Sequence, residues 1–153
     1  MLLLRHASAG PRLSMPSLDA ARELDRTGRR EASLLRGSLA GYSIDLIVSS
    51  PLVRCVQTVG PLGKALGVDV EVRRELEPGA TRKDALRLLR ELPPTALVCT
   101  HREVLESVFD VAIECEKGGA WVVERRGRSL TPVAYLPPPA AQPRRPRAAL
   151  VSR

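Results

Sequence analysis

Two short apolar runs each end beside a histidine, and these are the only two histidines of the chain. The first run, Leu2-Leu3-Leu4, stops at Arg5 and His6, and the second, residues 95–100, stops at His101. Short apolar runs of this kind are typical of buried strands. Because ligands of open α/β sheets bind just beyond the carboxyl ends of the strands, we expect Arg5 and both histidines to face one site. Two unrelated surface histidines are the alternative that spacing alone leaves open.

Helix and strand patterns alternate along the rest of the chain. We expect a loop over residues 11–21, a helix with Thr27 as its N-cap that Gly41 stops, a strand over 44–48, a helix over 51–66, a strand over 68–72, a helix over 81–92, a helix over 103–114, and a hairpin from residues 120–124 and 129–135. This alternation predicts a three-layer α/β/α sandwich with a largely parallel central sheet.

The length of 153 residues fits a single domain with one good core. Proline, alanine and arginine dominate from residue 137 onward, a composition that cannot bury a core. We therefore place the domain at residues 1–136 and predict that residues 137–153 form a basic tail, disordered or loosely packed.

The formal net charge is +7, and nearly all the basic residues are arginine, which suits bidentate recognition of phosphate. An aromatic content of 3% argues against nucleic-acid binding by base stacking. A basic nucleic-acid-associated protein stays as an alternative because of the tail sequence Pro143-Arg144-Arg145-Pro146-Arg147.

Three cysteines without paired spacing, Cys55, Cys99 and Cys115, indicate a reduced compartment rather than a disulfide scaffold. The sequence has no Cys-x-x-Cys or His-x-x-x-His spacing of the kind that binds a structural metal, so we expect neither metal nor cofactor. No signal peptide or membrane span is apparent. We expect a cytoplasmic monomer with no membrane partner.

The stretch after the strand over 44–48 reads Ser49-Ser50-Pro51-Leu52-Val53-Arg54-Cys55-Val56-Gln57-Thr58. Pro51 suits the first turn of a helix, where its missing N–H costs nothing. Arg54 is then close to a helix N-terminus, a favourable place for an anion. In the predicted fold Arg5, His6, Arg54 and His101 converge at one edge of the sheet.

These motifs together resemble the histidine phosphatase superfamily, which has the phosphoglycerate-mutase-like fold. Arg5-His6-Ala7 is similar to its Arg-His-Gly/Ala signature, residues 49–58 to its Ser-Ser-Pro-x-x-Arg-x-x-Gln-Thr motif, and residues 98–101 to the strand that delivers a second histidine. The chain looks most like the short branch, which holds the SixA-type phosphohistidine phosphatases and the phosphatase domain that follows a Nudix domain in some fused proteins.

The resemblance implies a metal-independent phosphatase that hydrolyses a phosphomonoester or a phosphohistidine. His6 is the implied nucleophile and forms a phosphohistidine intermediate. Arg5 and Arg54 then clamp the phosphoryl oxygens, and His101 donates to the same group. The phosphorylated substrate is a small molecule or a phosphohistidine protein.

Four further residues are candidates for substrate binding: Ser8, Arg12, Arg102 and Glu77. Glu77 falls where larger family members carry an acidic proton donor, and a solvent-facing loop glutamate is the alternative reading. Arg102-Glu103 stands where small residues usually follow the second histidine, so Arg102 either contacts substrate or obstructs entry. That departure leaves open a catalytically inactive phosphoryl-binding domain of the same fold.

Overall fold

The structure is a computed structural model that describes residues 1–140, so residues 141–153 of the expected tail lie outside the described part. The elements, in chain order, are β1 (Leu2–Arg5), α1 (Pro16–Ala20), α2 (Arg26–Ser38), β2 (Leu46–Ser49), α3 (Val53–Leu66), β3 (Val70–Val72), the short 3-10 helix η1 (Arg74–Leu76), α4 (Arg82–Glu91), β4 (Ala96–Thr100), α5 (Arg102–Phe109), β5 (Ala120–Arg126) and β6 (Ser129–Leu136).

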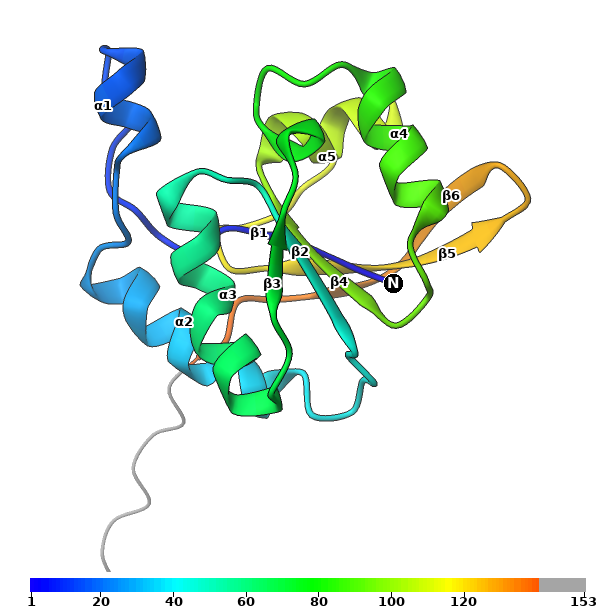
Figure 1. Cartoon of the computed structure of the whole chain (residues 1–153), viewed down its shortest axis with the longest axis horizontal. Coiled ribbons are helices and arrows are strands. Elements are labelled where there is room, and N and C mark those ends of the chain that lie inside the picture. The colour runs from blue at the N-terminus through cyan, green and yellow to red at the C-terminus, as the bar shows by residue number, and fades with distance from the viewer. Residues whose placement is uncertain (141–153) are drawn as a thin grey trace, which may run out of the picture.

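The six strands form one sheet in the order β3-β2-β4-β1-β5-β6. Strands β3, β2, β4 and β1 run parallel, and the β5–β6 hairpin adds two antiparallel strands beside β1. Helices α2 and α3 lie on one side of the sheet, and α4 and α5 lie on the other (Figure 1). The predicted three-layer α/β/α sandwich is therefore confirmed.

Strand β1 is buried on both faces, which explains its unbroken leucine run. Leu2 and Leu4 pack into the cluster formed with α2 and α3, whereas Leu3 packs into the cluster formed with α4 and α5. A strand in the middle of a parallel sheet needs apolar side chains in both directions, because helices cover both faces.

Helix α4 matches the sequence pattern closely. Thr81 caps it by accepting the N–H of Asp84. The five residues predicted to face inward are all buried: Ala85, Leu86, Leu88, Leu89 and Leu92.

Two expectations about the first helices are wrong. Residues 11–21 contain the short helix α1, which begins with Pro16 at its first position and buries none of its residues. Because no face of α1 is buried, its sequence has no periodic apolar pattern from which the helix could be predicted. The N-cap of α2 is Asp25, not Thr27, because the Asp25 carboxylate accepts the N–H of Gly28.

Helix α5 ends sooner than expected, at Phe109, because Asp110 takes a left-handed backbone conformation with φ 56°. Val111 and Ala112, predicted to face inward, are consequently exposed. Among residues 1–140, no helix combines the length and apolar character needed to cross a membrane.

Gly28 permits a close approach that carries a stability prediction. A Cβ at Gly28 would lie 1.9 Å from the backbone oxygen of Ser8, whereas a Cβ at Gly37 of the same helix would meet nothing within 4 Å. We expect Gly28→Ala to lower the free energy of unfolding by about 1–3 kcal/mol, as overpacking does. Gly37→Ala, the control, should raise it by up to about 1 kcal/mol. Urea unfolding of both variants makes the comparison, and equal stabilities would contradict the close contact.

Candidate phosphoryl-binding site

The carboxyl ends of β1 and β4 open into a cavity of about 420 Å³. Arg5, His6, Arg54 and His101, the four residues predicted to converge, all line it. β1 and β4 pair in parallel with Arg5 opposite Thr100, so His6 and His101 follow their strands side by side. Their ring centroids are 5.3 Å apart.

His6 presents one ring nitrogen to the cavity. Its Nδ1 lies 2.8 Å from the carbonyl oxygen of Ala7, which only accepts hydrogen bonds, so Nδ1 is assigned the proton. Its Nε2 then keeps a lone pair, which accepts the N–H of Nε of Arg54 at 3.3 Å. Burial lowers the His6 pKa to about 3, and the nearby ring of His101 and the charges of Arg54 and Arg5 add to this effect, although the hydrogen bond to Ala7 opposes it. His6 is therefore neutral at physiological pH.

Arg54 is the second residue of α3, and only 2% of its surface is exposed. Its Nη1 donates to the backbone oxygen of Asp19 at 2.9 Å, and its Nη2 lies 3.5 Å from a carboxylate oxygen of the same residue. Burial, followed by the charge of Arg22, lowers the Arg54 pKa from its ordinary value. The guanidinium thus stands beside the His6 lone pair with its fork towards α1.

Two buried polar atoms among residues 1–140 have no hydrogen-bond partner, and both belong to cavity residues: Nε of Arg5 and Nδ1 of His101. Arg5 uses its Nη1 on the carbonyl oxygen of Cys115 at 2.7 Å. Leaving a buried donor unpaired costs about 1–3 kcal/mol, so such groups are rare unless a ligand completes them. An anion in the cavity would satisfy both.

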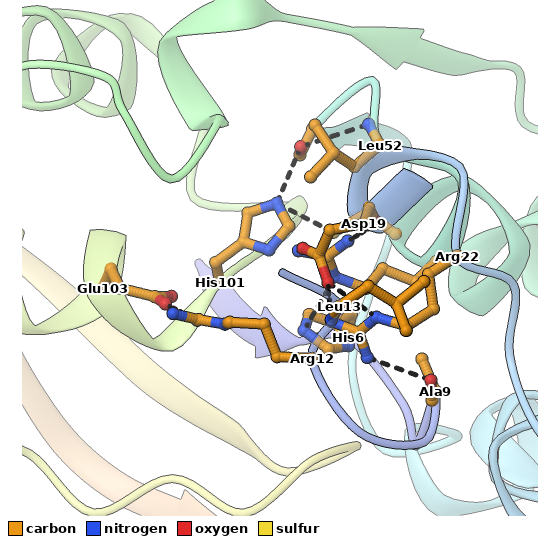
Figure 2. A network of polar contacts seen from close by, with 12 residues as sticks. His6, Ala9, Arg12, Leu13, Asp19, Arg22, Leu52, His101 and Glu103 are labelled. Carbon is orange, nitrogen blue, oxygen red and sulfur yellow. Dashed lines mark hydrogen bonds and ion pairs between the residues drawn. The ribbon is translucent and has the colours of Figure 1, made fainter. Parts of the chain in front are cut away.

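Sequence reasoning missed Asp19 and Arg22 (Figure 2). The Asp19 carboxylate accepts from Nε of Arg22 at 3.1 Å and from the N–H of Leu13 at 2.8 Å. Arg22 lines the cavity and donates to the backbone oxygens of Ala9 and Gly10. The only sequence signal was the three-residue spacing of an acid and a base, which is common on surface helices.

Arg12 and Arg102, two of the predicted substrate-binding residues, also line the cavity. Each arginine pairs with a glutamate of α5, and both glutamates also line the cavity. Arg12 pairs with Glu103, and Nε of Arg102 lies 2.7 Å from Glu106. These arginines are largely exposed, which places the two ion pairs at the rim.

The structure does not bring Ser8 and Glu77 to the cavity. The Ser8 hydroxyl donates to the Asp25 carboxylate at 2.6 Å and is thereby turned towards the start of α2. Glu77 directly follows η1, is half-buried, and is absent from the cavity lining. Their predicted contacts with substrate are not supported by this geometry.

Residues 1–140 contain no group of three or more histidine, cysteine or acidic side chains placed to hold a metal ion. The positive charge at this site comes instead from side chains, above all from Arg5, Arg22 and Arg54. Arginine donors of this kind stabilise phosphoryl oxygens in other phosphoryl-transfer sites.

The model of the histidine phosphatase superfamily (branch 1) matches residues 1–78. An 8-oxo-(d)GTP phosphatase from Mycolicibacterium smegmatis is 28% identical over 155 residues, which cover 91% of this chain and 48% of that protein. The chain thus spans about half the length of this relative.

Two solved structures share the fold. One is the protein histidine phosphatase SixA complexed with tungstate, with a TM-score of 0.76, 22% identity, and coverage of 90% of this chain and 96% of that chain. The other is a phosphoserine phosphatase from Entamoeba histolytica in complex with 3-phosphoglyceric acid, with a TM-score of 0.67, 13% identity, and coverage of 88% and 95%.

The low pKa of His6 predicts a pH-dependent stability. Between the folded pKa of about 3 and the ordinary value of about 6.5, the unfolded chain binds a proton that folded His6 does not. The free energy of unfolding therefore falls as the pH drops, by about 2 kcal/mol from this group between pH 7 and pH 5. Urea unfolding at both pH values measures this change. In His6→Gln the free energy of unfolding should fall by about 2 kcal/mol less between pH 7 and pH 5 than it does in the wild type. An identical drop in wild type and variant would contradict the depressed pKa.

Proposed function

Because this chain belongs to the histidine phosphatase superfamily, we propose that it hydrolyses phosphorylated substrates through a phosphohistidine formed on Nε2 of His6. The observation that carries the proposal is the hydrogen bond from Nδ1 of His6 to the Ala7 carbonyl oxygen. It leaves Nε2 without a proton at a cavity lined by arginines, where its lone pair accepts from Nε of Arg54 until a phosphoryl group takes that place. A neutral imidazole in that orientation is a ready nucleophile.

In the first step, Nε2 of His6 attacks the phosphorus atom and a P–N bond forms. The bond from phosphorus to the leaving oxygen breaks, and that oxygen keeps the electron pair and takes a proton from water. Charge develops on the phosphoryl oxygens, where Arg5, Arg54 and His101 lie ready to donate. Nε of Arg5 and Nδ1 of His101 have no other partner, so these two groups need little reorganisation as the charge appears, whereas Nε of Arg54 must first leave the lone pair of His6.

In the second step, a water molecule attacks the same phosphorus and loses a proton to solvent. The P–N bond breaks, its electron pair returns to Nε2, and inorganic phosphate leaves. Splitting the displacement into two steps lets one cluster of donors serve both transition states. Side-chain cations carry the charge that a metal carries in other phosphoryl-transfer enzymes, so neither metal nor cofactor enters the proposal.

Family membership favours this reaction over a nucleic-acid-associated protein. The presence of Arg5, His6, Arg54 and His101 in one cavity supports it over an inactive phosphoryl-binding domain of the same fold. The inactive domain makes a distinct prediction, because it would bind phosphate and show no turnover.

Hydrolysis of an aryl phosphate tests the reaction. We expect wild-type turnover to persist in EDTA, and His6→Ala to lose activity by at least about 10³-fold, because no other group forms the intermediate. The melting temperature above pH 7 is the control for folding. Substantial activity in His6→Ala would exclude His6 as nucleophile, and loss in EDTA that a divalent ion restores would exclude the metal-independent route.

The charge of the cavity also bears on the substrate. Six cationic side chains and two carboxylates line it, and Asp19 adds a third carboxylate that pairs with Arg22 and Arg54, so three positive charges remain when the histidines are neutral. A phosphomonoester dianion neutralises two of these three charges. The proposed substrate therefore carries a further anionic group beside the transferred phosphoryl, as nucleoside diphosphates and triphosphates do. The printed activity of the M. smegmatis relative, on 8-oxo-(d)GTP, is of this class.

Lys117 is the residue best suited to test this substrate class. It lines the cavity, and within residues 1–140 its side chain makes no hydrogen bond or ion pair, although its charge also favours the ionised form of the Asp25 and Glu31 carboxylates. We expect kcat/KM for a nucleoside diphosphate to exceed that for the matching monophosphate by about 10-fold, a charge-assisted hydrogen bond being worth about 1.5–3 kcal/mol. Lys117→Gln should reduce this ratio several-fold, and Lys64→Gln, remote from the cavity, should not. A ratio near one in wild type would contradict the proposed class.

A further inference from the structure

His101 has a buried hydrogen-bond partner that the reaction above does not use. Its Nε2 lies 2.9 Å from the hydroxyl oxygen of Ser50, which follows strand β2. Ser50 is 0% exposed and His101 is 1% exposed, so no bulk water competes for this contact. The backbone N–H of Ser50 donates to the carbonyl oxygen of Cys99, which fixes the serine against β4.

The surroundings of Ser50 determine the direction of this hydrogen bond. Its Oγ already accepts the N–H of Leu52 at 3.3 Å, so that contact offers no acceptor for the hydroxyl hydrogen. Among residues 1–140 the remaining partner of the hydroxyl is Nε2 of His101. A buried hydroxyl hydrogen is rarely left unpaired, so Ser50 donates and Nε2 accepts.

Cys55 is the other group close to Nε2 of His101, with its sulfur 3.5 Å away. The thiol has an acceptor of its own, the carbonyl oxygen of Thr100 at 3.8 Å. It therefore does not need Nε2 for its hydrogen, and as an acceptor a neutral thiol sulfur is much weaker than a hydroxyl oxygen. A thiolate would instead accept a hydrogen from Nε2, and although burial raises the Cys55 pKa, the contacts with Cys99 and His101 lower it to about 6. Cys55 is 0% exposed, and a charge without access to water is costly, so Cys55 acts here as the neutral thiol and leaves the direction of the Ser50 hydrogen bond unchanged.

An imidazole that accepts at Nε2 carries its proton on Nδ1 when neutral. Nδ1 of His101 is the buried atom without a partner, and it lies on the ring edge opposite Ser50. Figure 2 shows that edge facing the side on which His6 and Arg12 lie. With the proton on Nδ1 the ring offers a donor to an anion, whereas the other tautomer would point a lone pair at it.

We propose that Ser50 is a positioning residue that holds neutral His101 in the Nδ1–H tautomer, so that the ring donates to a phosphoryl oxygen. The use made of that donor rests on the proposed phosphatase function. The tautomer itself does not, because it follows from the contacts of Ser50 alone. The role also gives a chemical reason for a hydroxyl at this position of the Ser-Ser-Pro stretch, where packing alone would accept alanine.

Long-range ¹H–¹⁵N spectra of the histidine rings test the tautomer directly, and the chain has only two histidines to assign. The His6→Gln variant identifies the His101 signals. At pH 8, above the ordinary range of imidazole titration, we expect Nδ1 of His101 to give a protonated-type signal and Nε2 an unprotonated-type signal. Ser50→Ala should move the proton to Nε2 in at least a large fraction of molecules, and Ser50→Thr, which keeps the hydroxyl, should restore Nδ1–H.

Ser49→Ala is the matched control, since Ser49 is equally buried but donates to the Ser50 carbonyl oxygen instead of the ring. It should leave the His101 signals in place. In activity, Ser50→Ala should lower kcat by about 10- to 100-fold, and Ser50→Thr should recover most of it.

An Nε2–H signal for His101 in the wild-type protein would overturn the proposal, even if Ser50→Ala fails to fold. So would an unchanged Nδ1–H signal in folded Ser50→Ala. The two proposals can also be separated. If the wild-type protein shows the expected tautomer and this depends on Ser50, but the protein hydrolyses no phosphorylated substrate, the proposed function is refuted and the role of Ser50 in setting the tautomer stands.

Discussion

A guanidinium buried against a neutral imidazole is the interaction on which the cavity depends. Arg54 is almost wholly buried, and its Nε lies 3.3 Å from Nε2 of His6. Removing a charge from water costs several kcal/mol unless other groups compensate, and here Asp19 does so with its carbonyl and its carboxylate. The same positive charge helps to keep His6 unprotonated. One contact therefore explains both the neutral state of His6 and the attachment of α1, a helix with no buried residue of its own.

The motif over residues 49–58 also has a structural role. Thr58 donates to the carbonyl oxygen of Arg54 at 2.6 Å and accepts the N–H of Ala7 at 3.0 Å. Gln57 accepts the N–H of Leu24 at 2.9 Å. These hydrogen bonds connect α3 to the loop after β1 and to the segment just before α2. They therefore determine the position of Arg54 relative to His6.

Much of the fold could be predicted from the sequence, because strands buried on both faces and amphipathic helices leave periodic apolar patterns. The convergence of His6 and His101 followed from the parallel pairing of their strands. Asp19 and Arg22 could not be found this way, since α1 buries nothing and its role lies in polar contacts with residues distant in sequence. Ser8 was misplaced for a related reason: a hydrogen bond to Asp25, not its position beside His6, determines where its hydroxyl points.

The position of β1 has a consequence for how the chain folds. This first strand lies between β4 and β5, and Leu2 pairs with both Leu97 and Val122. Its ladder partners are therefore the fourth and fifth of the six strands to leave the ribosome. During synthesis the leucine run therefore stays unpaired while most of the domain is made. Strand pairs with such a long separation in sequence also form slowly. His6 directly follows the first strand of this domain, yet its surroundings are completed only when nearly the whole domain has emerged.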